Sequence, residues 1–281
     1  MFYACFYFYC YTMKFYGIIS IIFLNKIVSA QNWSYSRPDE WPGECQRGNR
    51  QSPININFKN TIMEMMRPIE YVNYDRDFVA VIENEGYTLA LKFDNECCDK
   101  PSIRGSVIQS DYTLHNIHFH WAAEHTINNR RYPLEAHFVH YKTEAGNLTN
   151  ALNFGDGVVV LAVLYELSEI SNDVFDVITR TVDDVAHRVN QPVQLDAKIS
   201  PESLLPENLD NFFAYQGSLT TPNCNEVVTW IVYSQPAEIE ESQLEKLSDI
   251  YTEDDKRLVQ NYRPLQAVNG RGVLYTRGNY I

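Results

Sequence analysis

Short apolar runs rich in β-branched residues dominate the hydrophobic pattern of this chain. Residues 158–165 and 227–233 are continuous runs of this kind, which predict strands that are buried on both faces. Residues 78–82 are apolar and β-branched, and residues 87–93 alternate, so both segments also predict strands. The chain is therefore expected to be mostly β.

Helix-like spacing is scarcer than strand-like spacing. Apolar residues recur at helical intervals in residues 174–189, and residues 242–247 and 248–258 suggest one or two short helices near the end of the chain. With 281 residues, the chain fits one large domain. We therefore predict a mostly β (α+β) single domain with short peripheral helices, whose strand order these patterns do not give.

The first 30 residues are expected to be a secretory signal peptide. They contain no acidic residue, and a basic residue precedes an apolar run at residues 15–24 that is followed by small residues. Cleavage would leave residues 31–281 as a secreted, extracellular mature chain. The alternative is a signal anchor that stays in the membrane, although the apolar run is short for a membrane span. Either Met1 or Met13 is the start of the protein.

The acidic composition excludes one class of partner. The formal net charge is −13, and loss of Lys14 and Lys26 with the leader makes the mature chain more negative still. An acidic chain of this size repels nucleic acid, and no basic stripe is present. Because 45% of the residues are hydrophobic, a sizeable core can form. We expect no nucleic-acid partner and no membrane span in the mature chain.

Sequons and cysteines agree with export. Glycosylation sequons begin at Asn32 and Asn147. Four cysteines follow the leader, and an even number in an exported chain suggests disulfides: Cys45, Cys97, Cys98 and Cys224. Their spacing leaves all three full pairings open. We expect a monomer, with a dimer through Cys97 or Cys98 as the alternative.

Histidines are concentrated in one part of the chain. Six of the seven fall within residues 115–140. If residues 114–121 form a strand, His118 and His120 share one face with Asn116, because side chains alternate across a strand. The opposite face then carries apolar side chains that can pack on the core.

A second candidate strand supplies a third histidine. In residues 134–141, alternation puts Glu135, His137 and Val139 on one face. Antiparallel pairing of the two strands would bring His137 beside the first two histidines. Three neutral imidazoles match a catalytic zinc site, which has three protein ligands and keeps the fourth position for water. Nitrogen donors also favour zinc over calcium or magnesium.

The neighbouring residues suggest supporting roles. Asn116 and Glu135 each precede a candidate ligand by two residues on the same face, so they are expected to accept the second N–H groups of the rings. A His-x-His pair alone is more often a surface or core feature than a metal site. His125 and His140 do not share the face of the three ligands, so hydrogen-bonded structural roles suit them. His187 is expected at the surface of a helix.

Several motifs, in order along the chain, resemble the α-class carbonic anhydrases. The zinc motif of that family resembles residues 118–121 and 135–140, and a second hallmark resembles residues 217–222 with 228–230 after them. Shorter matches complete the resemblance, at residues 51–54, 124–126 and 261–264. The resemblance implies a single domain with a large central, mainly antiparallel, twisted β-sheet.

The resemblance also implies an activity, the zinc-dependent reversible hydration of carbon dioxide to bicarbonate and a proton by zinc-bound hydroxide. It implies that His118, His120 and His137 bind Zn²⁺. It also implies that Asn116 and Glu135 accept hydrogen bonds from the ring N–H groups of these ligands. Thr220 would accept a hydrogen bond from the hydroxide and donate one to Glu124, which orients the attacking oxygen.

Further roles carry over from the resemblance to the cavity and to two cysteines. Thr221 would lie near bicarbonate, and an apolar pocket for carbon dioxide would be formed by Val139, Val160, Leu219 and Trp230. The family's exported members join two cysteines at positions that resemble Cys45 and Cys224. Cys97 and Cys98 stay unassigned.

The chain differs from the family at the positions that transfer protons from the active site to solvent. Tyr87 stands where fast members have a proton-shuttling histidine, and a phenol with a pKa of about 10 is poorly suited to relay protons at neutral pH. Glu85 and Ala90 replace amides that organise cavity water. We predict an active enzyme with slower proton transfer. His115 is an alternative shuttle near the cavity mouth, although strict alternation places it off the ligand face.

Two other functions remain as alternatives. A catalytically weak, carbonic-anhydrase-like secreted binding or matrix protein would keep the fold without the reaction, but such relatives typically lose a zinc histidine and none is lost here. A zinc esterase would use the same nucleophile on activated esters. No serine with a dedicated His-Asp pair is evident for a different hydrolase mechanism.

Overall fold

The computed structural model describes residues 33–93 and 100–278. The predictions made for the leader, for Asn32 and for Cys97 and Cys98 lie outside these residues. Within the described ranges, no helix is both long and apolar enough to cross a membrane.

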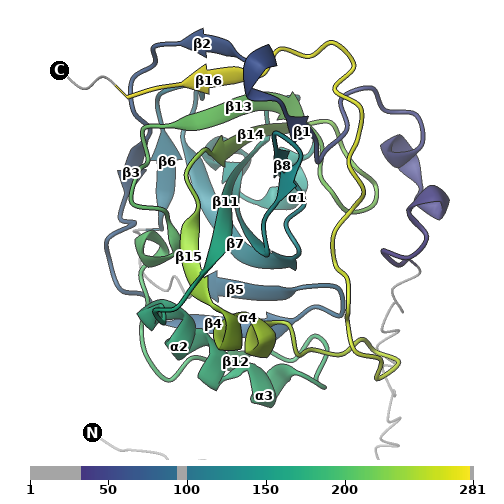
Figure 1. The fold of residues 1–281 in the computed structure, drawn as a ribbon, viewed down its shortest axis with the longest axis vertical. Coiled ribbons are helices and arrows are strands. Elements are labelled where there is room, and N and C mark those ends of the chain that lie inside the picture. The colour runs from purple at the N-terminus through teal and green to yellow at the C-terminus, as the bar shows by residue number, and fades with distance from the viewer. Residues whose placement is uncertain (1–32, 94–99, 279–281) are drawn as a thin grey trace, which may run out of the picture. The chain divides into compact units, whose positions relative to one another are not determined.

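One large twisted sheet forms the centre of the domain (Figure 1). Its strands follow one another in this order: β12 (Val193–Gln194), β4 (Ala80–Asn84), β5 (Leu89–Phe93), β7 (Tyr112–Trp121), β10 (Leu134–Lys142), β11 (Val158–Ser168), β14 (Val228–Tyr233), β13 (Phe212–Gly217), β16 (Leu274–Thr276) and β2 (Ile62–Glu64). Three more strands branch from this path: β15 (Ala237–Glu240), which pairs with β11, β6 (Ser102–Arg104), which pairs with β7, and β3 (Glu70–Val72), which pairs with β6.

Most neighbours in the sheet are antiparallel, as predicted. The parallel pairs in the large sheet are β11 with β14, β11 with β15, and β16 with β2. A small separate sheet contains β1 (Asn55–Ile56), β8 (Thr126–Ile127) and β9 (Arg130–Arg131). The sheet is therefore mixed but mainly antiparallel.

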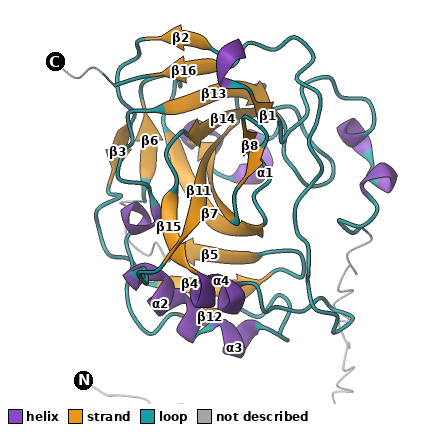
Figure 2. Ribbon diagram, viewed as in Figure 1, coloured by secondary structure: helices purple, strands orange, loops and turns teal. Residues whose placement is uncertain are grey.

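The helices are few and short, and they lie around the sheet (Figure 2). The α-helices are α1 (Leu148–Ala151), α2 (Asp173–Arg180), α3 (Val182–Val185) and α4 (Glu241–Leu247). Single turns of 3-10 helix occur at η1 (Pro38–Glu40), η2 (Gly43–Cys45), η3 (Phe58–Asn60), η4 (Thr143–Ala145) and η5 (Pro201–Leu204). The mostly β fold class with short peripheral helices is confirmed.

Two of the predicted helices need correction. The helix expected over residues 174–189 is two helices, and the second ends at Val185, because the chain then turns so that the N–H of Asn190 bonds to Asn84 at the edge of the sheet. No helix forms over residues 248–258. There the N–H of Thr252 bonds to the oxygen of Lys256 across a tight turn, in which Asp255 has a φ of 55°.

Strands β10 and β11, at the centre of the sheet, are covered on both faces. Phe138 and Leu161 belong to a large apolar cluster that includes residues of α2 and α3, whereas Val139 and Val160 belong to a second cluster on the other face. Because both faces are covered, β11 is apolar throughout its buried part, as the run at residues 158–165 predicted. The second cluster surrounds the candidate site.

Candidate metal centre

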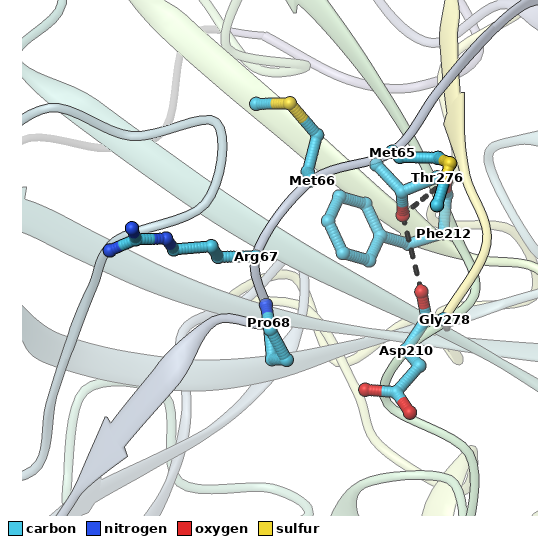
Figure 3. Close-up of a pocket in the computed structure, with 8 residues that line it drawn as sticks. All are labelled: Met65, Met66, Arg67, Pro68, Asp210, Phe212, Thr276 and Gly278. Carbon is cyan, nitrogen blue, oxygen red and sulfur yellow. Dashed lines mark hydrogen bonds between the residues drawn. The ribbon is translucent and has the colours of Figure 1, made fainter. Parts of the chain in front are cut away.

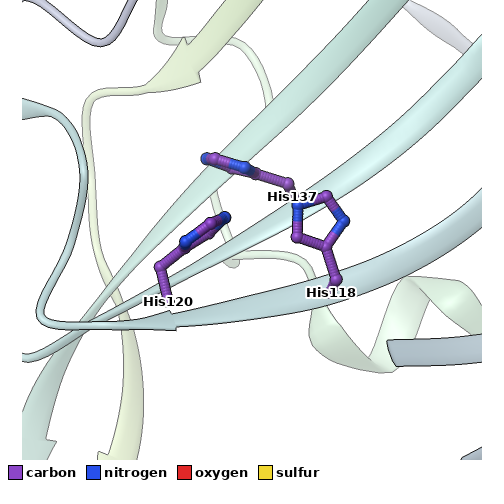
Figure 4. A group of neighbouring side chains, drawn as sticks. All are labelled: His118, His120 and His137. Atoms are coloured by element: carbon purple, nitrogen blue, oxygen red, sulfur yellow. The ribbon is translucent and has the colours of Figure 1, made fainter. Parts of the chain in front are cut away.

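The three candidate zinc ligands lie on adjacent strands. His118 and His120 are on β7, and His137 is on β10, directly opposite His118 in the antiparallel register. One nitrogen from each ring lies within 4.8 Å of the other two, and the rings are turned toward one another (Figure 4). The juxtaposition expected from alternation and pairing is therefore present in the fold.

Two of the rings are oriented by residues on their own strands. Nδ1 of His118 lies 3.5 Å from Oδ1 of Asn116, and Nε2 of His137 lies 2.6 Å from Oε1 of Glu135. These are the contacts expected of groups that fix the tautomer of a metal-binding histidine. They leave Nε2 of His118 and Nδ1 of His137 for a metal ion.

The third ring is held by a residue for which the sequence analysis assigned no role. Nδ1 of His120 lies 2.6 Å from the backbone oxygen of Asn261. The side chain of Asn261 also bonds to the backbone of Phe119 and Trp121, at 2.8 Å in each case. The side chain of Asn261 thus bonds to the backbone of β7 on both sides of His120. The motif at residues 261–264 was part of the family resemblance, but it did not predict the contact between Asn261 and His120.

The remaining ring nitrogens suit a zinc ion. Nε2 of His120 is buried and has no hydrogen-bond partner among the described residues, an arrangement that costs free energy unless a ligand satisfies the atom. Burial lowers the pKa of both His118 and His120. Both rings are therefore neutral at neutral pH, which is the form that binds a metal. Three histidine nitrogen donors fit Zn²⁺ in an open, catalytic type of site.

Glu135 is fully buried and anchors one side of the centre. Its Oε1 accepts hydrogen bonds from Nε2 of His137 and Nδ1 of His125, and its Oε2 accepts one from the backbone N–H of His125. Burial alone would raise the pKa of Glu135, but the contacts with the two histidines lower it well below its ordinary value. The group is therefore a carboxylate, and His125 has a structural role as its position predicted.

Glu124 lies beside the centre with one oxygen unused. Its Oε1 accepts a hydrogen bond of 2.7 Å from the backbone N–H of Arg263. Its Oε2 is buried without a hydrogen-bond partner and lies 3.8 Å from Nε2 of His120. Thr220 is also buried, but the hydrogen bond that the resemblance implies from Thr220 is not made to Oε2 here. This oxygen remains available as an acceptor.

A disulfide holds the loop that carries Thr220. Cys45 and Cys224 are bonded, with 5.0 Å between their Cα atoms and a sequence separation of 179 residues. The backbone N–H of Cys224 donates to the oxygen of Thr221 at 2.8 Å. The pairing implied by the resemblance is confirmed, and it ties the loop after β13 to the N-terminal part of the domain.

A cavity of about 190 Å³ is lined by two of the three candidate ligands, His118 and His137. Its apolar lining residues include all four residues predicted for the carbon dioxide pocket, Val139, Val160, Leu219 and Trp230, together with Leu148. Its polar lining residues include Thr220, Thr221, Asn116, Glu85, Tyr87 and His115. Apolar and polar side chains thus share the lining of one cavity.

Tyr87 lines this cavity, as the resemblance implied. Its ring lies 5.2 Å from the ring of Trp33. Burial and the neighbouring carboxylate of Glu85 raise the pKa of Tyr87. Glu85 itself pairs with Lys92 at 2.9 Å, and the same Lys92 pairs with Glu83 at 2.6 Å. The phenol therefore stays protonated at neutral pH and is a poor proton relay.

A second cavity of about 290 Å³ lies near the end of β16 (Figure 3). It is lined by Met65, Met66, Arg67, Pro68, Asp210, Phe212, Thr276 and Gly278. These residues contain no histidine and no cysteine. None of the predicted ligands or catalytic residues lines this second cavity, so the smaller cavity beside the histidines is the candidate active site.

Asn147, the sequon residue that the structure describes, lies at the surface. It is exposed and precedes α1, where its side chain accepts a hydrogen bond of 2.9 Å from the N–H of Asn150. The side-chain nitrogen, to which a glycan would be attached, is not used in this contact. Modification at Asn147 stays a prediction.

The fold and the centre together define a class of protein, a mostly β domain with three converging histidines beside a cavity. The family of eukaryotic-type carbonic anhydrases matches residues 30–277. The chain is 32% identical to the human mitochondrial carbonic anhydrase 5B over 238 residues, which are 80% of this chain and 73% of the relative. It is 30% identical to carbonic anhydrase 4 of Oryctolagus cuniculus over 258 residues, which are 88% of this chain and 82% of the relative.

It is likewise 32% identical to the mitochondrial carbonic anhydrase 5A of Rattus norvegicus over 246 residues, which are 83% of this chain and 79% of the relative. Both the family match and these relatives extend across the histidine centre. The chain belongs to the eukaryotic-type carbonic anhydrase family and is a carbonic anhydrase enzyme.

Proposed function

We propose that this protein binds Zn²⁺ through His118, His120 and His137 and catalyses the reversible hydration of carbon dioxide to bicarbonate and a proton. One observation carries the proposal. Each of the three rings has one nitrogen engaged by an oriented acceptor, and the other nitrogens converge beside a cavity. Zinc bound there would act as a Lewis acid that lowers the pKa of water toward neutrality and so supplies a nucleophile.

Thr220 and Glu124 would orient that nucleophile. The unused Oε2 of Glu124 is a buried acceptor, and the Thr220 hydroxyl is the donor that the resemblance assigns to it. When its proton points to Glu124, the Thr220 oxygen can only accept a hydrogen bond from the cavity. Fixing one O–H direction in this way aims a lone pair at the substrate, and loss of such positioning costs about 10²-fold in rate.

The mixed lining of the cavity suits both carbon species. Val139, Val160, Leu219 and Trp230 offer an apolar surface to carbon dioxide, which is small and uncharged. Thr221 also lines the cavity, and its hydroxyl would bond to bicarbonate. The apolar wall would hold the substrate without hydrogen bonds, so the charged product would leave more easily than it would from a polar pocket.

The protein is further proposed to act outside the cell. In this proposal residues 1–30 are a cleaved signal peptide, residues 31–281 are the catalytic domain, and Asn32 and Asn147 carry glycans. The Cys45–Cys224 disulfide supports export, because disulfides persist in oxidising compartments. Mass spectrometry of the protein from culture medium would test this, and an N-terminus other than residue 31 would contradict the predicted cleavage site.

A direct test combines metal analysis with stopped-flow hydration assays. We expect about one zinc per chain, hydration activity that disappears with a chelator and returns with zinc, and loss of both zinc and activity in His120→Ala. His187→Ala is the matched control, since His187 is exposed on the surface. A zinc-loaded, folded protein without hydration activity would refute the proposal and favour a binding or matrix role.

A further inference from the structure

Strand β7 contains a bulge at His115. In the register with β10, Val139 lies opposite Asn116, but the next residue, His140, lies opposite Leu114. His115 is therefore an extra residue without a partner on β10. A bulge of this kind changes the direction of a side chain, and bulges are frequent next to active sites.

The bulge breaks the alternation that would place His115 on the far face. His115 and its neighbour Asn116 both line the cavity, although consecutive residues of a regular strand point to opposite faces. Asn116 is buried and His115 is exposed. His118 thus lines the cavity with Asn116 beside its ring, and the exposed His115 lies where the cavity meets solvent.

His115 also has the freedom that a proton carrier needs. The ring of Tyr141 on β10 lies edge-on at 6.4 Å between centroids, and no hydrogen bond fixes either nitrogen of His115 among the described residues. The charged groups that face it are Lys92 of β5, Glu85 of the turn before β5, and Lys100. Partial burial of the ring and the charge of Lys92 lower the pKa of His115, and Glu85 opposes them.

The other titratable side chains that line the cavity are not free to carry a proton. Tyr87 stays protonated, Glu85 is paired with Lys92, and His118 and His137 belong to the proposed metal centre. Among the described cavity residues, His115 is thus the one with a free side chain of the type that ordinarily changes charge near neutral pH. Its Cα lies at most about 10 Å along the strand from that of His118, a gap that a few solvent molecules can bridge.

We propose that His115 is the proton relay of this enzyme, a role that rests on the proposed function. Hydration converts carbon dioxide and water into bicarbonate and one proton. That proton passes through solvent in the cavity to the neutral imidazole of His115, which becomes an imidazolium. The imidazolium then gives the proton to a buffer base and returns to its neutral form, so the residue is unchanged after each cycle.

The test compares His115→Ala with His187→Ala, because these are the two exposed histidines of the chain. At low buffer concentration we expect kcat for hydration to fall about tenfold or more in His115→Ala, since one positioned acid–base group contributes about 10²–10⁴-fold. The value of kcat/KM should stay unchanged, because carbon dioxide conversion precedes proton release. Added imidazole should restore kcat, and His187→Ala should behave as the unaltered protein.

A second readout does not depend on turnover. In protein labelled with ¹³C-histidine, the resonance that disappears in His115→Ala should titrate with a midpoint below about 6.5. Absence of titration between about pH 5 and 8 would refute the relay. Unchanged kcat at low buffer in a variant with normal kcat/KM would refute it as well. If the unaltered zinc-loaded protein hydrates no carbon dioxide, the proposed function fails first, and the relay fails with it.

Discussion

Glu135→Gln tests how the metal centre is organised. The carboxylate receives three hydrogen bonds, and all of them come from N–H donors: Nε2 of His137, Nδ1 of His125 and the backbone N–H of His125. Glutamine has nearly the same shape but offers only one oxygen. Its NH₂ group must therefore face at least one of the donors.

Either orientation of the glutamine has a cost that follows from this geometry. If the amide oxygen stays with the two rings, the NH₂ group meets the backbone N–H of His125, and a buried unsatisfied pair of donors costs about 1–3 kcal/mol of stability. If the amide is reversed, Nε2 of His137 must accept a hydrogen bond. Its proton then moves to Nδ1, the nitrogen that would bind zinc, and metal affinity falls by about 10–100-fold.

Both effects can be measured on the same protein. Zinc affinity is determined by competition with a chromophoric chelator, and stability is determined on the metal-free protein by urea unfolding. Glu166→Gln is the control, because Glu166 forms a surface ion pair with Arg130, and such pairs contribute about 0–1 kcal/mol. A Glu135→Gln protein with unchanged zinc affinity and unchanged stability would refute the reasoning.

Three further predictions concern stability, pH and turnover. Replacing both Cys45 and Cys224 by alanine should lower the free energy of unfolding by about 5 kcal/mol, from the loop-entropy estimate for a separation of 179 residues; a loss below about 1 kcal/mol in denaturant unfolding would contradict this. Burial lowers the pKa of His140 to about 3, so the unfolded chain binds a proton below about pH 6.5 that the folded chain does not. Stability should therefore fall by about 1.4 kcal/mol per pH unit on acidification below that point, and His140→Gln should reduce this slope in unfolding measured between pH 4 and 6. In the His115→Ala background, Tyr87→His should restore kcat at low buffer with kcat/KM unchanged, and no gain in that background would contradict the view that a phenol at this position prevents proton relay.

The strands and the histidine pairs could be predicted because both depend on local periodicity. Alternation in residues 114–121 and 134–141 put the correct side chains on one face, and pairing of β7 with β10 then placed His137 opposite His118. The apolar run at residues 158–165 likewise predicted a strand covered on both faces, which is β11. In each case the pattern lies within a single strand, and pairing with one adjacent strand is enough to place its side chains.

Contacts between distant segments could not be predicted in this way. Asn261 lies 141 residues from His120 in the sequence, and it acts through a backbone oxygen that any residue type possesses. Arg263 likewise holds Glu124 through its backbone N–H rather than through its charge. The bulge at His115 is a property of the register between two strands, so strict alternation assigned this residue to the wrong face. The helix expected over residues 248–258 was wrong because a tight turn at Asp255 replaced it.

The segment that contains Asn261 and Arg263 couples the site to the completion of the fold. Asn261 holds His120 and the backbone of β7 on both sides of it, while Arg263 positions Glu124 and bonds through its guanidinium to Gln51 and Ser52. A chain that has not docked this segment lacks the acceptor that orients His120. Metal affinity depends on such acceptors, and a ligand that binds only the folded state stabilises it. Binding of zinc at the proposed site and docking of the C-terminal segment would therefore favour each other, although the segment contributes none of the three proposed ligands.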